Sequence, residues 1–351
     1  MKKKLAYCAV LLFSLNCFAQ SKTNNSLLWR ITNDKNEHVS YLFGTIHLPQ
    51  KKFVVYSDSV YEAIQQVNKF YNEIDFLNQA IFGDEELMAF FEEKGKYMDS
   101  IRHTAGWKNL INRINKQYNT DLDPEDLEAF AGFSQKLLGS YFEPEEGVTM
   151  PDMMLAQFAK TLGKKTGGLE TYLLQFKMLY DIVDARLSDT TLDLKDEGEM
   201  MVKMKDHYLK ENIDSIATIV ENVNPSYRKI VFDDRNKTMS DSIAKHVLDE
   251  SSFFAIGAGH LVGKLGVIAL LRKKGFTMTP VLSGNKISLL VINNIIDKYR
   301  FKDEAKAITE DTLIDTKIEV REEPPPPPPK TNPPKVKMSP VPKSKTKGKQ
   351  E

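Results

Sequence analysis

The spacing of hydrophobic and polar positions divides the first part of the chain into short strands and one helix. Residues 27–32 and 39–43 are apolar segments of strand length, and the polar turn at residues 33–36 between them predicts a β-hairpin. Helical spacing follows over about residues 57–68, and residues 70–74 form a third apolar run of strand length. The pattern therefore predicts three strands and a helix before residue 75.

The middle of the chain is helical by its spacing. One predicted helix face carries Trp107, Leu110, Ile111, Ile114 and Tyr118, and another carries Leu169, Leu173, Phe176 and Tyr180. We interpret both stripes as core positions. Helical patterns continue over residues 199–210 and 227–248.

The last part of the patterned region returns to strands. Residues 253–256 form a short apolar strand, residues 265–274 a helix and residues 277–282 a final strand, with Gly275 in the usual position of a helix stop. No internal repeat and no low-complexity linker separates these segments. We therefore predict one domain over residues 20–320 with a helical insertion in its middle.

The first nineteen residues have the pattern of a secretory signal peptide. Three lysines precede an apolar run over residues 5–15, and Ala19 supplies the small residue expected before a cleavage point. A membrane anchor is the alternative, but the run is shorter than the ~20 residues that span a bilayer. Lipidation of Cys17 is a second alternative, although the residues before it match a lipoprotein signal poorly. The prediction is export to the periplasm or the extracellular space, with an envelope lipoprotein as the less favoured outcome.

Composition and charge exclude some kinds of site and some classes of protein. Cys8 and Cys17 both lie in the predicted signal peptide, so the mature chain would have no disulfide and no thiolate ligand or nucleophile. The whole chain has 48 basic and 48 acidic residues, which argues against a nucleic-acid-binding protein. Residues 20–320 include 37 basic and 45 acidic residues, a net charge of −8, whereas residues 321–351 include eight basic and three acidic residues.

The C-terminal residues 321–351 form a segment of unusual composition. Ten of the sixteen prolines lie in the last 28 residues, interleaved with seven lysines. So little apolar content cannot offset the entropy of ordering, which predicts a disordered, partly polyproline II tail. The alternatives are a ligand for a proline-binding module and a basic arm that contacts an anionic surface of the cell envelope.

Two GxxH sequences each follow a predicted strand. Gly44-Thr45-Ile46-His47 comes directly after the second strand, and Gly257-Ala258-Gly259-His260 comes directly after residues 253–256. With 18 glycines and six histidines, composition alone predicts roughly 0.3 such matches in a chain of this length. Two matches at strand ends are therefore much less expected than one.

The position of these turns suggests a ligand site. Glycine lets the chain bend sharply as it leaves the sheet, so the histidine three residues later projects above the strand ends, where open sheets bind ligands. Neutral imidazoles bind zinc and similar divalent ions, and a carboxylate would complete a three-ligand site. Glu73 and Asp75, which end the third predicted strand, are the carboxylate candidates. The alternative is that both histidines simply hydrogen-bond nearby loops and that both carboxylates are ordinary strand-end residues.

Other polar residues stand out less clearly. On a helix, Asn236 shares an apolar stripe with Phe232, Met239 and Ile243, and Arg235 lies on the adjoining ridge. Either this pair fastens the helix to sheet loops, or Arg235 supports an anion in the site. Glu170 and Gln175 are a similar but weaker case. Four further histidines fall on predicted turns or polar helix faces and are predicted to be solvated: His38, His103, His207 and His246.

Taken together, these segments resemble the TraB/GumN family, which includes the Tiki metalloproteases. The resemblance covers roughly residues 27 to 285, and the segments that carry it occur in the family's order: Leu28-Trp29-Arg30, the first GxxH turn, Glu73-Ile74-Asp75, Gly168-Leu169-Glu170-Thr171 with Gln175, Arg235-Asn236 and the second GxxH turn. The paired turns are its most specific part.

The resemblance implies an α+β domain with a central mixed sheet covered by helices. For the Tiki branch it implies a peptidase that depends on a divalent metal, with zinc, manganese or cobalt as candidates. His47 and His260 would then be metal ligands, Glu73 a ligand or general base, and Arg235 a supporting site residue. The chain lacks the HExxH helix of ordinary zinc peptidases, so this mechanism depends on the resemblance.

Three functions follow as hypotheses. The leading one is an exported metal-dependent hydrolase that acts on a peptide or protein substrate. The second is a non-enzymatic envelope protein that binds a metal, a haem-like group or a peptide in the same cleft. The third is a structural envelope protein held by its proline- and lysine-rich tail, for which both histidines would be dispensable.

Overall fold

Six strands form one mixed sheet in the part of the chain that the computed structural model describes, residues 25–78, 84–192, 195–287, 291–292 and 294. The strands are β1 (Leu28–Thr32), β2 (Ser40–Thr45), β3 (Lys69–Asn72), β4 (Lys165–Gly168), β5 (Ser252–Gly257) and β6 (Thr277–Val281). Their order across the sheet is β4-β3-β5-β2-β1-β6. The four strands from β4 to β2 run parallel, and β1 is antiparallel to both β2 and β6. The carboxyl ends of four neighbouring strands therefore meet at one edge.

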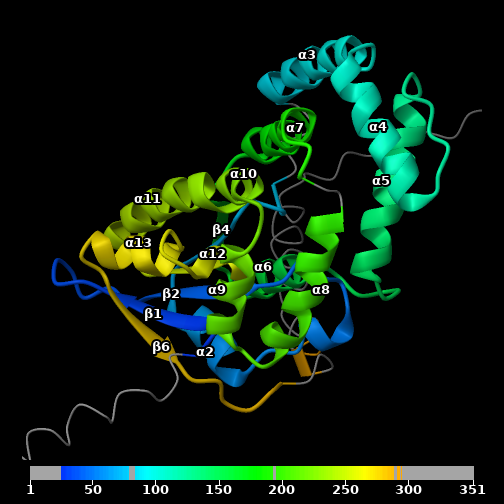
Figure 1. The fold of residues 1–351 in the computed structure, drawn as a ribbon. Helices are drawn as coiled ribbons and strands as arrows, with labels where there is room; N and C mark the ends of the chain where they lie inside the picture. Colours follow the sequence, from blue (N-terminus) through cyan, green and yellow to red (C-terminus); the bar gives the residue numbers. More distant parts are fainter. Residues whose placement is uncertain (1–24, 79–83, 193–194, 288–290, 293, 295–351) are drawn as a thin grey trace, which may run out of the picture. The chain divides into compact units, whose positions relative to one another are not determined.

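Helices cover the sheet and extend beyond it (Figure 1). They are η2 (Lys51–Phe53), α2 (Asp58–Gln66), α3 (Glu85–Ile101), α4 (Ala105–Tyr118), α5 (Leu127–Phe142), α6 (Pro151–Thr161), α7 (Tyr172–Ser188), α8 (Lys195–Leu209), α9 (Ile213–Glu221), α10 (Pro225–Arg228), η4 (Lys229–Asp233), α11 (Asp234–Asp249), α12 (Ala258–Leu261) and α13 (Val267–Lys273). The predicted α+β fold with a helical middle is confirmed.

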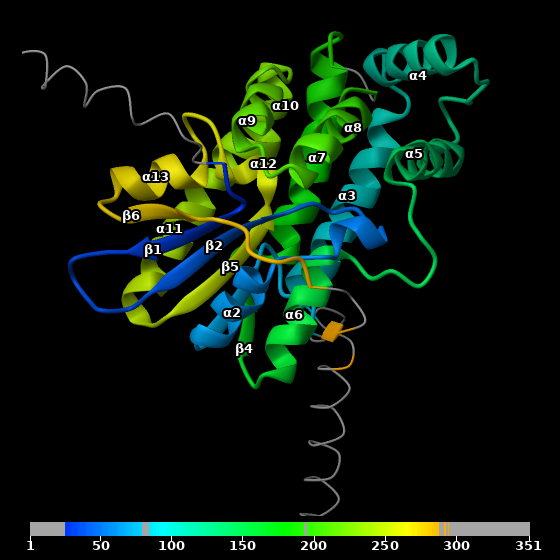
Figure 2. The same cartoon turned by 90° about the horizontal axis from the view of Figure 1, so that it is seen from below.

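The two faces of the sheet are packed by alternating residues of the same strands. Phe70 of β3 and Phe253 of β5 stack on one face, with ring centroids 5.4 Å apart. Tyr71 and Phe254, the next residues along each strand, stack on the other face. There Tyr71 also stacks on His246 of α11 at 4.2 Å, so His246 is a packed residue and its predicted solvation was wrong. Figure 2 shows α2 and α6 on the opposite side of the sheet from α11 and α13.

The helical insertion has an apolar cluster of its own. Its buried members are Ile101, Trp107, Leu110, Ile111 and Ile114, which include most of the first predicted stripe. In the second stripe, Phe176 of α7 meets Phe91 of α3 edge to face at 4.8 Å. Both stripes are therefore packing positions, as their spacing predicted.

The short strand β4 was not predicted from the sequence. Its four residues, Lys-Thr-Gly-Gly, lack the alternation that marks a strand. The glycines are required by close packing: a Cβ at Gly167 would lie 2.9 Å from the ring of Tyr71, and one at Gly168 would lie 2.7 Å from the backbone nitrogen of Asp75. The segment is a strand because its neighbour β3 pairs with it in parallel, which only the tertiary structure supplies.

Two of the predictions concern the two ends of the chain. The predicted signal peptide at residues 1–19 and the proline- and lysine-rich tail at residues 321–351 both lie outside the described residues. Within the described ranges, no helix combines the length and the apolar character needed to cross a bilayer.

Candidate functional site

Strand register places the two GxxH turns side by side. Thr45 at the end of β2 is paired with Gly257 at the end of β5, and Asn72 at the end of β3 is paired with Ala255. The turns also touch directly, because a Cβ on Gly44 would lie 2.6 Å from a methyl carbon of Leu261. The glycine was expected to allow a sharp bend, but Gly44 lies inside β2 and is paired with Ile256, so what it allows is this close contact.

Two histidines and two glutamates follow the carboxyl ends of the four parallel strands. His47 comes two residues after β2, Glu73 comes directly after β3, Glu170 comes two residues after β4, and His260 lies in the single-turn helix α12 that follows β5. The sheet therefore collects residues that are up to 213 positions apart in the sequence.

His47 is held by a buried carboxylate from α6. Its Nδ1 lies 2.9 Å from Oδ2 of Asp152, whose other oxygen accepts a hydrogen bond from the Thr45 hydroxyl. Because the carboxylate can only accept here, Nδ1 carries the proton and Nε2 is turned toward Glu73. Burial acts to lower the pKa of His47, but the negative charges of Asp152 and Glu73 raise it well above its ordinary value.

His260 is buried and held in a defined tautomer. Its Nδ1 lies 2.7 Å from Oδ1 of Asn236, and the amide nitrogen of Asn236 donates to the carbonyl of Leu265 at 3.0 Å. This orientation of the amide makes Nδ1 the donor, which leaves a lone pair on Nε2. Burial lowers the pKa of His260 to about 3, so the imidazole is neutral at neutral pH.

The carboxylate of Glu73 lies between the two histidines. Its Oε1 is 3.6 Å from Nε2 of His47 and 3.7 Å from Nε2 of His260, which is too long for hydrogen bonds. The same oxygen accepts a 2.7 Å hydrogen bond from the backbone N–H of Gly257. A Cβ at Gly257 would lie 3.2 Å from this oxygen and 3.3 Å from Nε2 of His47, so glycine leaves space among the three groups.

Arg235 joins Glu73 to a second buried carboxylate. Its Nη2 donates to Oε2 of Glu73 and to Oε2 of Glu170, both at 2.6 Å, and its Nε lies 3.1 Å from each oxygen of Glu170. Gln175 donates to Glu170 at 2.9 Å and to Glu73 at 3.3 Å. The guanidinium is therefore shared between two carboxylates.

The two carboxylates respond differently to this environment. Burial acts to raise the pKa of Glu73, but its interactions with His260, Arg235 and His47 hold it well below its ordinary value. Because His260 is neutral at neutral pH, Arg235 and His47, whose own pKa is raised, are the charged partners that keep Glu73 ionised there. Burial raises the pKa of Glu170 despite its contacts with Arg235.

Of the two carboxylate candidates, Glu73 and Asp75, the structure places only Glu73 at the site. β3 ends at Asn72 and not at residue 74, so the chain has already turned when it reaches Asp75. The Asp75 side chain accepts from the backbone N–H of Leu77 at 3.2 Å and is not among the residues that line the site cavity. Only Glu73 faces the histidines.

The two alternatives for Arg235 and Asn236 are both partly met. Asn236 fastens α11 to the loop before α13 through Leu265, as the simpler interpretation expected. Arg235 binds the carboxylates of Glu73 and Glu170, which are part of the protein. The weaker candidates Glu170 and Gln175 belong to the same network.

Sequence reasoning missed Asp152. The residue follows Pro151 in the first turn of α6. A signal was present, because Asp152 shares a helix face with Leu155, Ala156 and Ala159, and all four are buried. A carboxylate on an apolar stripe must find a partner.

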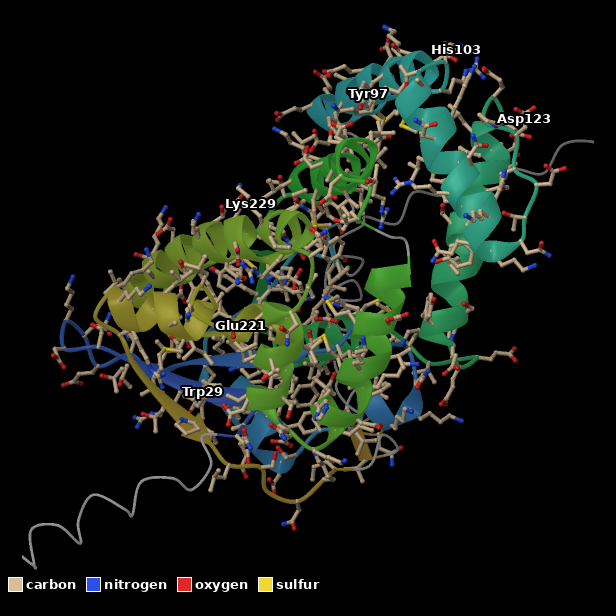
Figure 3. All side chains as sticks on the ribbon, viewed as in Figure 1. Trp29, Tyr97, His103, Asp123, Glu221 and Lys229 are labelled. Carbon is tan, nitrogen blue, oxygen red and sulfur yellow. The ribbon has the colours of Figure 1, made fainter. Side chains whose placement is uncertain are left out.

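His103 lies near α3 and α4, away from the sheet edge (Figure 3), and pairs with Glu125.

A cavity of about 320 Å³ opens beside these groups. Its polar wall comes from the strand ends and from α11, including His47, Glu73, Arg235 and His260. The Glu170 side chain is not among the lining residues, so it supports the wall from behind.

The donor set suits a divalent metal ion chemically. The Nε2 of neutral His260 has a lone pair, and the Nε2 of His47 gains one when its proton is lost on metal binding. Together with one carboxylate oxygen these are ligands that zinc and similar ions accept. Bond lengths of about 2.0–2.2 Å place neighbouring ligand atoms of a tetrahedral ion roughly 3.3–3.6 Å apart. The separations of 3.6 and 3.7 Å around Glu73 lie at or just above the upper end of this range.

The described residues contain no group of three or more His, Cys, Asp or Glu side chains that could hold an ion as they stand. The lone pair of His260 Nε2 also faces Nη1 of Arg235 at 3.3 Å, a contact that an ion would replace. The residues therefore fit a metal by their chemistry and by the space at Gly257, and binding requires a small contraction around Glu73.

Comparisons with known proteins identify two named relatives of this chain. The chain is 23% identical over 318 residues to "Metalloprotease TIKI2" of Danio rerio, which covers 73% of this chain and 61% of that protein. It is 25% identical over 347 residues to "Metalloprotease TIKI1" of Xenopus tropicalis, covering 80% and 66%. The chain thus spans just under two thirds of the length of these relatives. No solved structure matches it significantly.

The family comparison covers the whole region that contains the site. The model of the TraB/PrgY/gumN family matches residues 27–280, which run from β1 to β6 and include every side chain described above. On this evidence the chain belongs to the TraB/PrgY/gumN family.

Proposed function

We propose that this protein is a divalent-metal-dependent hydrolase that cleaves peptide bonds. The observation that carries the proposal is the convergence of two imidazole Nε2 atoms on one oxygen of Glu73, at 3.6 and 3.7 Å. Asp152 and Asn236 hold the far nitrogen of each ring, as partners of metal-binding histidines commonly do. Two relatives that are named metalloproteases support the choice of reaction.

Each residue would have a defined task. His47, His260 and Glu73 would hold the ion, and a divalent ion in this position would supply a Lewis acid that polarises a carbonyl and activates water. A general base works best with a pKa near the operating pH, whereas the pKa of Glu73 is held well below its ordinary value. This favours Glu73 as an anionic ligand over Glu73 as the base.

Arg235 would act as a positioning residue. Its guanidinium is engaged by Glu73 and Glu170, which keeps Glu73 ionised and fixes the direction of its carboxylate. The conformation of the cavity wall then depends on the ion pair between Arg235, which lines the cavity, and Glu170, which lies behind it.

Metal titration tests the proposal. The protein stripped with a chelator should bind close to one equivalent of zinc, manganese or cobalt ion, and the His47→Ala/His260→Ala variant should bind at least about 100-fold more weakly, since two of three ligands are gone. A His38→Ala/His103→Ala variant, which removes two histidines outside the cavity, is the matched control. Equal affinity in the site variant and in the parent would overturn the assignment of the ligands.

The same samples distinguish an enzyme from a binding protein. The metal-loaded parent should cleave members of a peptide library, and both removal of the metal and the double histidine substitution should stop cleavage. Stoichiometric binding without turnover on any peptide would instead favour the non-enzymatic envelope protein.

Export and envelope contact belong to the proposal as well. The pattern of residues 1–19 supports export with cleavage after Ala19, and the basic composition of residues 321–351 supports contact with an anionic envelope surface. The intact mass of the exported protein should lack residues 1–19. Retention of their mass would contradict cleavage.

A further inference from the structure

A second part of the cavity wall is apolar, and it adjoins the histidines through Phe232, whose ring lies 5.2 Å from that of His260. Side chains from α7, α8, α10 and the π-helical turn η4 form it: Met178, Leu179, Met200, Met201, Met204, Tyr227, Val231 and Phe232. We call this wall and the space it encloses the methionine cavity. A polar wall and an adjoining apolar wall match a peptide, whose backbone is polar and whose side chain can be apolar.

Methionine is concentrated at this place. Four of the thirteen methionines of the chain line the one cavity. Met200 and Met204 are buried, while Met178 and Met201 are partly exposed. Methionine side chains are flexible and polarisable, so they adapt to apolar groups of different shape and make favourable contacts with aromatic rings. Such a wall accepts a class of apolar groups better than a single one.

The charges beside the cavity disfavour an anionic ligand. The single guanidinium of Arg235 is shared between Glu73 and Glu170, and the carboxylate of Asp152 stands behind His47. Three acidic side chains surround Arg235 and His47, so each positive group there is already paired with a carboxylate of the protein. A neutral apolar group meets neither this repulsion nor the cost of burying a charge.

We infer that the methionine cavity holds an apolar side chain of the substrate peptide, beside the bond that is cleaved. This inference rests on the proposed function, and it names the substrate class: peptides with a long unbranched or aromatic residue next to the scissile bond, in preference to small or charged residues.

Binding to the metal-free protein tests the inference separately from catalysis. The probe is a fluorescently labelled decapeptide of glycine and serine with one central residue that is varied among Phe, Met, Ala, Asp and Lys. Fluorescence anisotropy should show that the Phe and Met peptides bind roughly 10- to 100-fold more tightly than the Ala peptide, because a large apolar side chain is buried. The Asp peptide should bind most weakly.

Two variants change the cavity without touching the histidines, Glu73 or Arg235. Met201→Trp should fill the cavity and reduce the preference for Phe over Ala to within about threefold. Leu179→Lys places a charge at a lining position that is 51% exposed, where folding tolerates it, and should weaken the Phe peptide while strengthening the Asp peptide. Met88→Trp and Met88→Lys are matched controls, since Met88 is 58% exposed on α3 and does not line the cavity.

The two proposals can fail independently. If the Phe preference depends on the cavity but the metal-loaded protein cleaves none of these peptides, the binding inference stands and the hydrolase proposal fails. If cleavage occurs without a preference for apolar residues, or if Leu179→Lys binds every peptide as the parent does, the inference is wrong and the hydrolase proposal stands. Tightest binding of the Lys or Asp peptide would also overturn it.

Discussion

Replacing Glu73 with glutamine should lower the rate of peptide hydrolysis by about 10²- to 10³-fold or more, because the site loses its only carboxylate that faces both imidazoles in the described structure. Glutamine keeps the shape of the side chain and can still accept the hydrogen bond from Gly257. Its neutral amide is a poor metal ligand, so affinity for the ion should fall together with the rate. Initial rates and metal titration on the same preparations measure both effects.

The matched control is Glu170→Gln. It makes the same chemical change within the same hydrogen-bond network, but on a carboxylate that does not line the cavity. Its rate should stay within about tenfold of the parent, while its stability changes about as much as that of Glu73→Gln. If Glu170→Gln were inactivated to the same degree, the loss would reflect the shared network and not the position of Glu73 between the histidines.

Replacing Arg235 with methionine should lower the free energy of unfolding by about 3–5 kcal/mol, which makes it the most destabilising single change proposed for this site. The substitution keeps an unbranched side chain but leaves Glu170 buried without a positive partner and Glu73 with only His47 beside it. Unfolding in urea, followed by circular dichroism on the metal-free protein, measures this effect. Arg235→Lys keeps the charge but loses the planar guanidinium that bonds both carboxylates. Its free energy of unfolding should therefore lie between those of the parent and of Arg235→Met.

A double variant separates electrostatics from packing. In Glu170→Gln/Arg235→Met one uncompensated carboxylate is gone, so this variant should regain roughly 1–3 kcal/mol relative to Arg235→Met alone. If the double variant is no more stable than Arg235→Met, the loss comes from the removed packing of the arginine and not from the buried charges.

The cost of losing Arg235 should also depend on pH. In the parent, the pKa of Glu73 is lowered on folding, so its ionisation stabilises the fold above the unfolded-state pKa of about 4.3, and this stabilisation is lost as the pH falls below that value. Arg235→Met lacks most of this contribution at every pH. The difference in unfolding free energy between parent and variant should therefore be largest near neutral pH and should narrow below about pH 4.

Several features of the site followed from local sequence. The hairpin, the buried strand before His260 and the helix around Arg235 all have patterns that survive in the structure, because each element buries a face that is regular along the chain. The two GxxH turns were found for the same reason. A strand that ends in glycine and is followed by histidine is a local arrangement, and the parallel pairing of β2 with β5 then places the two turns together.

Other features could not be read from local sequence. The strand β3 was expected to continue to residue 74, which kept both Glu73 and Asp75 as candidates, whereas the chain turns after Asn72 and only Glu73 faces the histidines. β4 was missed because its glycines serve a close approach to β3 and not an alternating pattern. The methionine cavity is formed by helices from distant segments, so no single stretch of sequence indicates it.

The sequence by itself determined five of the six described strands, the resemblance to a family and the two histidines that follow strands, because hydrophobic period and turn chemistry are local properties. The tertiary structure decided which acidic residues meet them. Asp152 from α6 and Glu73 from the end of β3 reach the histidines only through strand order and helix packing. Burial makes His260 neutral, while Arg235 and His47 keep the buried carboxylate of Glu73 ionised.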